Sequence, residues 1–555
     1  MWISLCIALL FSQARTPFEQ AQDSGVVIGK QGWLFHIAEF GNYTLETPQD
    51  SETKRITIEV ISKLFAKRNI PLVLALIPAK IHLYESSLPP EMPLPDVVKN
   101  RYVNALQSLT SNGVNVPDLL TAFQKGQQDP IERKYPVYQK LDHHWSSRGA
   151  LIAAQVIGNA LRELPQLNDE AHAQIQLAAQ PEEVYLESSL IKRVPEALRS
   201  SFVPEAFIPY DEVKSDPSLL GDEAFPIALV GSSASKGGRL WPFDSGIAAE
   251  TQFNVLNAAQ VGRGPWLPLE DYLRSSTYQE SPPKALVWQL WEAFLLDVDQ
   301  GQLPKNWLWT IAPLILGSCD KPVLGSGPTL DLPATQWGDY LSASVQTQSG
   351  REWVLSLSTP NGTVTRDEVV PSEGETQYFN EALPLGTTRI EIKPKNPQTS
   401  VTLSSAKICK IPSEVSDALQ PQGSVDLVRV DRYAGLETFN FSGVENGTMR
   451  WSEGPEMSIH FWNGGTLKPK VQLAFYNPIE GQHVRVKLNG TTLLDISALT
   501  AGTNITKDFV LPAIPGDNTL SFEYTLANGM GSTFAEQDTR KLTVLFNTLR
   551  LDFSK

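Results

Sequence analysis

The hydrophobic pattern of the sequence changes near residue 320, and this change constrains the fold more than any other feature. Between residues 24 and 316, short apolar runs alternate with segments whose apolar residues recur at helical spacing. The run from Pro71 to Pro78 is continuously apolar, as expected of a parallel strand buried on both faces. Alternating strands and helices predict a parallel sheet with helices on both sides. Residues 24–316 are therefore predicted to form an α/β domain.

The same pattern predicts the order of elements within this domain. A hairpin should enter the domain, and a long irregular section, rich in Pro and Glu, should form an insertion or lid. The predicted elements are the hairpin over 23–35, helices over 51–68, 96–112 and 147–163, strands over 71–78, 114–116, 226–230 and 285–290, and the insertion over 165–225.

Beyond residue 320, apolar and polar residues alternate, which is typical of all-β structure. A polar stretch between Pro412 and Gly423 separates two such blocks, and Asn489-Gly490 in the second block is a strong hairpin signal. The sequence therefore predicts a multidomain chain, with β-sandwiches over 320–412 and 423–555 after the α/β domain.

Length and charge narrow the possible functions. A chain of 555 residues is too long for one core. The formal net charge of −15, without a run of Lys or Arg, argues against nucleic acid as a partner.

The first residues predict export. Residues 1–15 contain an apolar block with the length of a signal-peptide core, although a positive start is missing, so an uncleaved N-terminal anchor is the alternative. Removal of this leader would take Cys6 with it and leave Cys319 and Cys409. In an oxidising compartment these two predict one disulfide, with two separate buried thiols as the alternative.

A possible catalytic site comes from two separate segments. Asp142 and His144 are two residues apart just before a predicted helix, and if the segment is extended their side chains converge while His143 points away. The strand at 226–230 leads directly into a Gly-Ser segment, where it would present a serine at its carboxyl end. Together they predict a Ser-His-Asp site, and the candidate nucleophiles are Ser232, Ser233 and Ser235.

No cofactor is predicted, and metal catalysis is disfavoured because the chain has neither H-E-x-x-H nor a paired-Cys site. The natural candidates for oxyanion donors are the backbone N–H of Ser233 itself and nearby Gly or Asn groups.

Four short motifs, in this order, resemble the SGNH-hydrolase-like domain of bacterial alginate O-acetyltransferases, the AlgX/AlgJ group. The motifs are Gly29-Lys30-Gln31-Gly32-Trp33-Leu34-Phe35, then Ile77-Pro78-Ala79-Lys80 with Tyr84, then Leu141-Asp142-x-His144-Trp145 with Gly149-Ala150, then Gly231-Ser232-Ser233. The resemblance covers residues 24–316. Ser232 stands where the family usually has Thr or Asp.

The resemblance implies a flavodoxin-like parallel sheet and a triad of Asp142, His144 and Ser233. It also implies a periplasmic or secreted polysaccharide O-acetyltransferase that forms an acetyl-serine intermediate. A membrane-bound O-acyltransferase partner would deliver the acetyl groups. The first β block resembles, in its placement, the carbohydrate-binding β-sandwich of AlgX-like members. The alternatives are a carbohydrate acetylesterase and a non-catalytic polysaccharide-binding scaffold.

Weaker candidates surround this site. Lys80 could reach a substrate carboxylate or form a structural ion pair, and Tyr138 and Trp145 could form a sugar platform or a wall of the site. Gln289 and Glu292 come after Ala285–Trp288, where the end of that strand should meet the predicted crevice. In the β blocks, the candidates for stacking on sugars, each with a core position as the alternative, are Trp337, Trp353, Trp451 and Trp462.

Overall fold

A computed structural model describes residues 17–554, except for 42–51, 187, 215–223, 296–306, 318, 337, 348–351, 361, 370–376, 385, 398–399, 413–414, 416–420, 422, 430–435, 446–447, 464–467 and 514–515. The chain divides into two compact units. The first contains 65–273 and 280–304 with the N-terminal residues to 51, and the second contains 52–64, 274–279 and 305–555. The predicted domain boundaries stay predictions.

The predicted leader over 1–15 lies outside the described residues. Among the residues that are described, no helix is long and apolar enough to cross a membrane.

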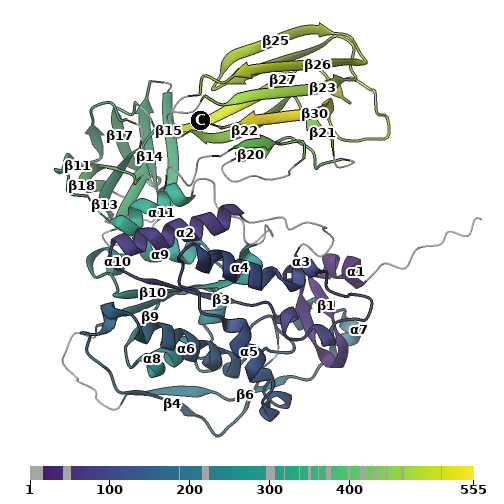
Figure 1. The fold of residues 1–555 in the computed structure, drawn as a ribbon. Coiled ribbons are helices and arrows are strands. Elements are labelled where there is room, and N and C mark those ends of the chain that lie inside the picture. The colour runs from purple at the N-terminus through teal and green to yellow at the C-terminus, as the bar shows by residue number, and fades with distance from the viewer. Residues whose placement is uncertain are drawn as a thin grey trace, which may run out of the picture. The chain divides into compact units, whose positions relative to one another are not determined.

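A parallel sheet of four strands organises the first unit (Figure 1). Its β3, β8 and β10 strands are buried at every position, as their continuous apolar runs predict. The predicted strand over 114–116 is reduced to one bridge, between Asn115 and Val73 at the edge of the sheet. In spatial order the strands are β3 (Leu72–Ile77), β10 (Ala285–Trp291), β8 (Ile227–Val230) and β9 (Val255–Asn257).

Helices cover this sheet, and α5 and α6 contact β3 while α8 contacts β9. The predicted helix over 96–112 is two helices, because Asn100 interrupts it. The predicted helices over 51–68 and 147–163 are confirmed. The α-helices of the described residues are α1 (Pro17–Ser24), α2 (Glu52–Lys67), α3 (Asp96–Lys99), α4 (Arg101–Ser111), α5 (Leu119–Gln127), α6 (Ser147–Arg162), α7 (Glu196–Arg199), α8 (Phe243–Thr251), α9 (Leu267–Arg274), α10 (Ser276–Glu280) and α11 (Trp307–Leu316).

Small antiparallel pairs complete the first unit. The predicted entry hairpin is confirmed as a pair of short strands, and the predicted insertion contains two further pairs. These pairs are β1 (Val26–Ile28) with β2 (Leu34–His36), β4 (Ile175–Ala179) with β7 (Tyr210–Lys214), and β5 (Val184–Leu186) with β6 (Glu205–Phe207).

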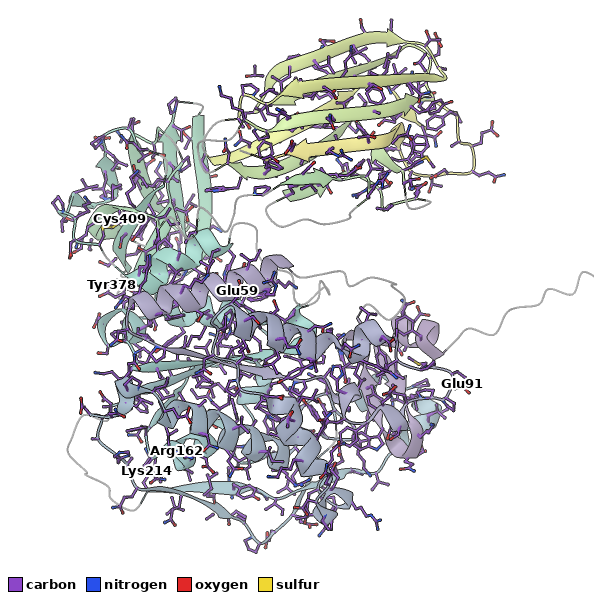
Figure 2. All side chains as sticks on the ribbon, in the orientation of Figure 1. Glu59, Glu91, Arg162, Lys214, Tyr378 and Cys409 are labelled. Carbon is purple, nitrogen blue, oxygen red and sulfur yellow. A yellow bond between two sulfur atoms is a disulfide. The ribbon has the colours of Figure 1, made fainter. Side chains whose placement is uncertain are left out.

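The first β block contains two four-stranded sheets whose buried side chains form one hydrophobic cluster. Cys319 and Cys409 are joined by a disulfide with a Cα–Cα distance of 5.9 Å, which confirms the predicted pairing (Figure 2). One sheet is β11 (Gly325–Gly327), β18 (Val401–Lys410), β13 (Asp339–Thr347) and β16 (Gln377–Ala382), and the other is β12 (Thr329–Asp331), β17 (Arg389–Pro394), β14 (Glu352–Thr359) and β15 (Gly362–Val369).

The second β block contains two five-stranded sheets with a separate shared cluster. The first sheet is β19 (Ser424–Asp426), β30 (Leu542–Asp552), β23 (Lys470–Asn477) and β26 (Thr503–Val510), with β21 (Arg450–Glu453) also paired to β30. The second sheet is β20 (Leu436–Phe439), β22 (Glu456–Asn463), β27 (Gly516–Tyr524), β24 (Gln482–Leu488) and β25 (Thr491–Leu499).

The four tryptophans proposed to stack on sugars lie in different environments. Trp353 is 2% exposed and belongs to the core cluster of the first block, so the stacking interpretation is wrong for it. Trp462 is 8% exposed, which also leaves no open ring face. Trp337 lies outside the described residues, and Trp451 is partly exposed.

Candidate active site

The serine turn lies at the carboxyl end of β8, where Gly231 and Ser232 lead into a 3₁₀ turn over Ser233–Ser235. Gln289 of β10 organises this turn, because its Oε1 accepts hydrogen bonds from Ser232 N at 2.8 Å, Ser232 Oγ at 3.0 Å and Ser235 Oγ at 3.2 Å. A Cβ at position 231 would lie 2.6 Å from the same oxygen, so this close approach requires glycine. Two of the three candidate hydroxyls are therefore held by Gln289.

The third hydroxyl faces the histidine. Ser233 Oγ lies 2.8 Å from His144 Nε2, and His144 Nδ1 lies 2.7 Å from Asp142 Oδ1. The two imidazole nitrogens thus join the serine and the carboxylate in one hydrogen-bonded row. The structure brings together the three residues that the motifs indicate, in the arrangement a Ser-His-Asp site requires.

Asp142 is held in its ionised form. Burial raises its pKa, but hydrogen bonds from His143 and His144 outweigh burial and hold the pKa well below its usual range. A permanently ionised carboxylate can fix the tautomer of His144 and stabilise the imidazolium formed when that ring takes a proton.

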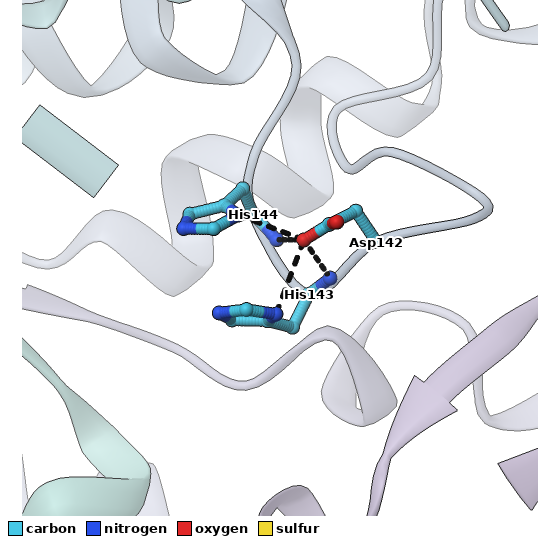
Figure 3. Close-up of side chains that lie close together, drawn as sticks. All are labelled: Asp142, His143 and His144. Carbon is cyan, nitrogen blue, oxygen red and sulfur yellow. Dashed lines mark hydrogen bonds and ion pairs between the residues drawn. The ribbon is translucent and has the colours of Figure 1, made fainter. Parts of the chain in front are cut away.

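The expectation that His143 points away is wrong. Its Nδ1 lies 3.1 Å from Asp142 Oδ1, so both imidazoles face the same carboxylate oxygen (Figure 3). The segment bends through turns instead of running extended, because the backbone N–H groups of both histidines also bond to Oδ1, at 2.8 and 3.3 Å. The His143 ring packs between His144 and Trp291.

The second carboxylate oxygen of Asp142 is held by two serines that the sequence analysis missed. Oδ2 accepts from Ser189 Oγ at 2.7 Å, from Ser189 N at 3.1 Å and from Ser188 Oγ at 3.1 Å. These serines come from the segment interpreted as an insertion or lid, which here positions the Asp142 carboxylate. A Ser-Ser pair carries no local signal of such a contact.

Lys80 holds in place the loop that carries Asp142 and His144. Its side chain is fully buried, and Nζ donates to Asp142 O at 2.6 Å, to Gln139 O at 3.0 Å and to Leu34 O. Burial lowers the pKa of Lys80, while Glu39, Glu205 and Asp142 oppose this effect. Glu205 of β6 supports the same loop, because its carboxylate accepts from the backbone N–H groups of residues 140 and 141 at 2.5 and 2.9 Å.

The four residues predicted to bind substrate are all buried, with exposed fractions of 0% for Lys80, Tyr138 and Gln289 and 1% for Trp145. Each is bonded to the protein itself: the Tyr138 hydroxyl donates to Pro78 O, and Trp145 Nε1 donates to Ala234 O at 3.0 Å. In this structure these side chains therefore hold the site together and offer no surface to a sugar. The Trp145 bond links the histidine loop directly to the serine turn.

Glu292 is also buried and structural. Its carboxylate accepts from Ala79 N at 2.7 Å, lies 2.8 Å from His82 Nε2 and pairs with Arg101 Nε at 2.5 Å. Burial raises its pKa, but Arg101 and His82 outweigh burial and lower the pKa to about 2. Glu292 ties the end of β10 to the segment that carries Lys80.

The open side of the site has an aromatic wall and a free donor. The Trp241 ring stacks on His144 at 5.8 Å, and its Nε1 lies 3.4 Å from Ser233 O. No acceptor among the described residues takes the Ser233 N–H, which leaves this donor available to a negatively charged oxygen beside Ser233 Oγ.

The strand order explains why Asp142 and His144 precede Ser233 in the chain. We number β8, β9 and β10 as strands 1, 2 and 3, and then return to the start of the chain, so that β3 is strand 4 and the Asn115 bridge is strand 5. In this circularly permuted numbering the spatial order is 2-1-3-4-5. That is the flavodoxin-like order, in which functional groups meet at the carboxyl ends of the strands. The segment carrying Asp142 and His144 then follows the last strand of the count, while Ser233 follows the first.

Donor atoms of Asp142, His143 and His144 all lie within 4.8 Å of one another, a geometry that could also hold a cation. A cation there would have to displace the proton that joins His144 to Asp142, so the hydrogen-bonded row and a metal site exclude each other. The absence of a catalytic metal stays a prediction.

A separate cavity of about 610 Å³ opens beside α6, between that helix and the segment around β6. None of the three triad side chains lines it, but Glu205, Lys140 and Ser146 do. The cavity therefore borders the segment that carries Asp142 and His144 without being lined by either side chain.

Comparisons with known proteins find relatives over the first part of the chain. Residues 26–292 match the model of a family described as the SGNH hydrolase-like domain of the acetyltransferase AlgX. The chain is 27% identical over 290 residues to the "Probable alginate O-acetylase AlgJ" of Pseudomonas fluorescens, covering 51% of this chain and 72% of the relative. It is 29% identical over 300 residues to the protein of the same description from Pseudomonas aeruginosa, covering 51% and 74%.

Among solved structures, Pseudomonas aeruginosa AlgX is similar in fold, with a TM-score of 0.53 and 17% sequence identity. The similarity covers 70% of this chain and 94% of that one. The shared fold thus extends beyond the parallel sheet into the β-rich part of the chain.

Proposed function

We propose that this chain, whose residues 26–292 match the model of the SGNH hydrolase-like domain of the acetyltransferase AlgX, transfers acetyl groups to hydroxyls of an exported polysaccharide. The observation that carries the proposal is the hydrogen-bonded row from Asp142 through His144 to Ser233. The proteins matched over this region are described as probable alginate O-acetylases, which makes an acidic polysaccharide the first acceptor to test.

In the first half of the reaction, Ser233 Oγ attacks the carbonyl carbon of an acetyl ester, and His144 Nε2 takes the hydroxyl proton. The carbonyl oxygen becomes negatively charged beside the free Ser233 N–H, a kind of donor that typically contributes ~3 kcal/mol to the transition state. As the ester bond breaks, the leaving alkoxide takes the proton back from His144, and acetyl-Ser233 remains.

In the second half, a polysaccharide hydroxyl gives its proton to His144 and attacks the acetyl-serine carbonyl. Ser233 then leaves and recovers the proton from the imidazolium, while Asp142 stabilises that cation throughout. Water in place of the sugar hydroxyl would give an acetylesterase. The choice between the two reactions depends on which hydroxyl reaches the acetyl group.

The proposal also covers the cellular compartment, the source of the acetyl groups and the role of the β-sheets. We place the protein in the periplasm, with a membrane-bound O-acyltransferase as the source of acetyl groups. We interpret each pair of β-sheets as a β-sandwich that binds or supports the polymer, since each pair shares one hydrophobic cluster.

The experiment that tests the function compares three serine variants on a soluble acetyl ester and on a deacetylated polysaccharide acceptor. Ser233→Ala should lower both activities by ~10⁶-fold, the usual cost of losing a triad nucleophile. Ser232→Ala and Ser235→Ala are the matched controls and should keep most activity. Full activity in Ser233→Ala would refute the mechanism, and hydrolysis without any transfer to sugar would identify an esterase.

A further inference from the structure

The sheet that contains β30 in the second β block carries a row of apolar side chains on its outer face. The strand register places Trp451 of β21 opposite Leu545 of β30, and Leu545 opposite Tyr476 of β23. Two aromatic residues thus flank one leucine, and the three are called the aromatic row below. Their strands β21, β30 and β23 are neighbours in one sheet (Figure 1). All three are partly exposed.

The burial pattern fixes the direction in which the row points. Residues on both sides of each member along its strand are buried, namely Arg450 and Ser452, Val544 and Phe546, and Phe475 and Asn477. Because side chains alternate between the two faces of a strand, the members of the aromatic row point away from the core. Phe534 packs against Trp451 with ring centroids 5.6 Å apart.

We propose that the aromatic row is a binding site for a linear polysaccharide, and that it lies on a domain separate from the triad. The inference rests on the proposed function, since the polymer bound is taken to be the acetyl acceptor. Trp451 and Tyr476 are two strands apart, which separates their Cα atoms by roughly 10 Å, about the length of two linked sugar rings. The apolar face of a sugar ring packs on an aromatic ring, while its hydroxyls need hydrogen-bonding groups at the edge.

The surroundings of the row supply those groups. Asn504 of β26 continues the row beyond Tyr476 and is exposed. One step along the strands, Ala474 lies between Thr548 and Thr506, so a small side chain is flanked by two hydroxyls. Arg550, further along β30, is 46% exposed and lies 3.9 Å from Asp426 Oδ2, so its charge already has a partner within the protein.

The shape of the strip favours a chain-like ligand over a globular partner. A stable protein interface needs a broad buried patch, whereas this strip is one side chain wide and has Asn504, Thr506 and Thr548 beside it.

The outer face of the other sheet in the same block differs, because ion pairs occupy it. His483 and Arg485 pair with Asp495, and Arg485 and Lys487 pair with Glu523. Charges that already pair with one another leave few free donors for a ligand, so binding is assigned to the face with the aromatic row.

The test uses the full chain and two probes, deacetylated alginate and neutral hydroxyethylcellulose, with affinity measured by electrophoresis through polymer-containing gels. Trp451→Ala and Tyr476→Ala should each weaken binding to the retained polymer at least tenfold. Tyr476→Phe keeps the ring and should stay within about twofold of the parent protein. Phe439→Ala is the matched control, since Phe439 is a 44% exposed aromatic on the other sheet and should not affect binding. Thermal unfolding confirms that each variant is folded.

The outcomes separate this inference from the proposed function. If neither polymer is retained, or if Trp451→Ala binds like the parent protein, the aromatic row is not a polysaccharide site. If Trp451→Ala instead changes a dimer into a monomer and leaves polymer binding intact, the row is a contact between copies, and the inference is overturned. Ser233→Ala should bind polymer normally. A Ser233→Ala protein that still transfers acetyl groups refutes the function and leaves the binding site standing.

Discussion

The serine turn and the Asp142–His144 loop meet in one site but are held in place by different means. The serine turn follows directly from a buried strand, and one neighbour in the sheet, Gln289, fixes it. The loop has no regular structure and depends on Lys80, Ser188, Ser189 and Glu205, which come from distant parts of the chain. Ser233 is thus positioned by local structure, while Asp142 and His144 need long-range support.

The largest effect expected on the loop side comes from Asp142→Asn. The amide cannot hold the same tautomer of His144 or stabilise its cation, so ester hydrolysis should fall by ~10⁴-fold at neutral pH. The variant should also change how stability depends on pH. The pKa of Asp142 is lowered in the folded protein, so its stabilising contribution is present above the ordinary value of 3.8 and is lost as the pH falls.

Kinetics and urea unfolding as a function of pH measure both effects of Asp142→Asn. The parent protein should lose stability on acidification below about pH 4 more steeply than the variant. Equal slopes would show that Asp142 is not held ionised by the loop.

Lys80→Met should have the next largest effect. It removes a buried cation that joins the backbone of β2 to the loop, and it leaves the carbonyls of Leu34, Gln139 and Asp142 without their donor. Loss of one member of such a buried set typically costs ~3–5 kcal/mol. Activity should fall as well, because the loop is no longer fixed. Lys140→Met, at a partly exposed position on the same loop, is the matched control. Equal behaviour of the two variants would contradict the role assigned to Lys80.

The smallest effect is expected from Ser189→Ala, which removes one hydrogen bond to Asp142 Oδ2 but leaves the Ser189 N–H in place. A single hydrogen bond to a charged group is worth ~1.5–3 kcal/mol, so kcat should fall about tenfold. Ser189→Thr keeps a hydroxyl and should recover most of the activity. If Ser189→Ala were as damaging as Asp142→Asn, the contrast between the two sides of the site would need revision.

The two sides also differ in how far the sequence predicted them. The strands over 71–78, 226–230 and 285–290 were predictable because the first two are continuous apolar runs and the third is apolar except for Gln289, and these strands position Ser233 and Gln289. The choice of Ser233 over Ser232 and Ser235 from the residues alone was not possible, since it depends on which hydroxyls Gln289 takes from the neighbouring strand.

The supports of the loop could not be predicted, for a physical reason. Ser188, Ser189 and Glu205 contact the loop across 46 to 65 residues, and such pairings leave no periodic pattern in the sequence. The four residues expected to touch substrate, Lys80, Tyr138, Trp145 and Gln289, are buried in this structure, and the sequence does not reveal in which direction a side chain points.

The central claim is that Ser233 carries the acetyl group, and peptide mass spectrometry after a short incubation with an acetyl ester tests it most directly. The account predicts a mass increase of one acetyl group on the peptide containing Ser233, with fragmentation placing it on that residue, and no such increase in His144→Ala. Turnover with the acetyl group on Ser232 or Ser235, or with no acetylated serine in this turn at any time, would contradict it.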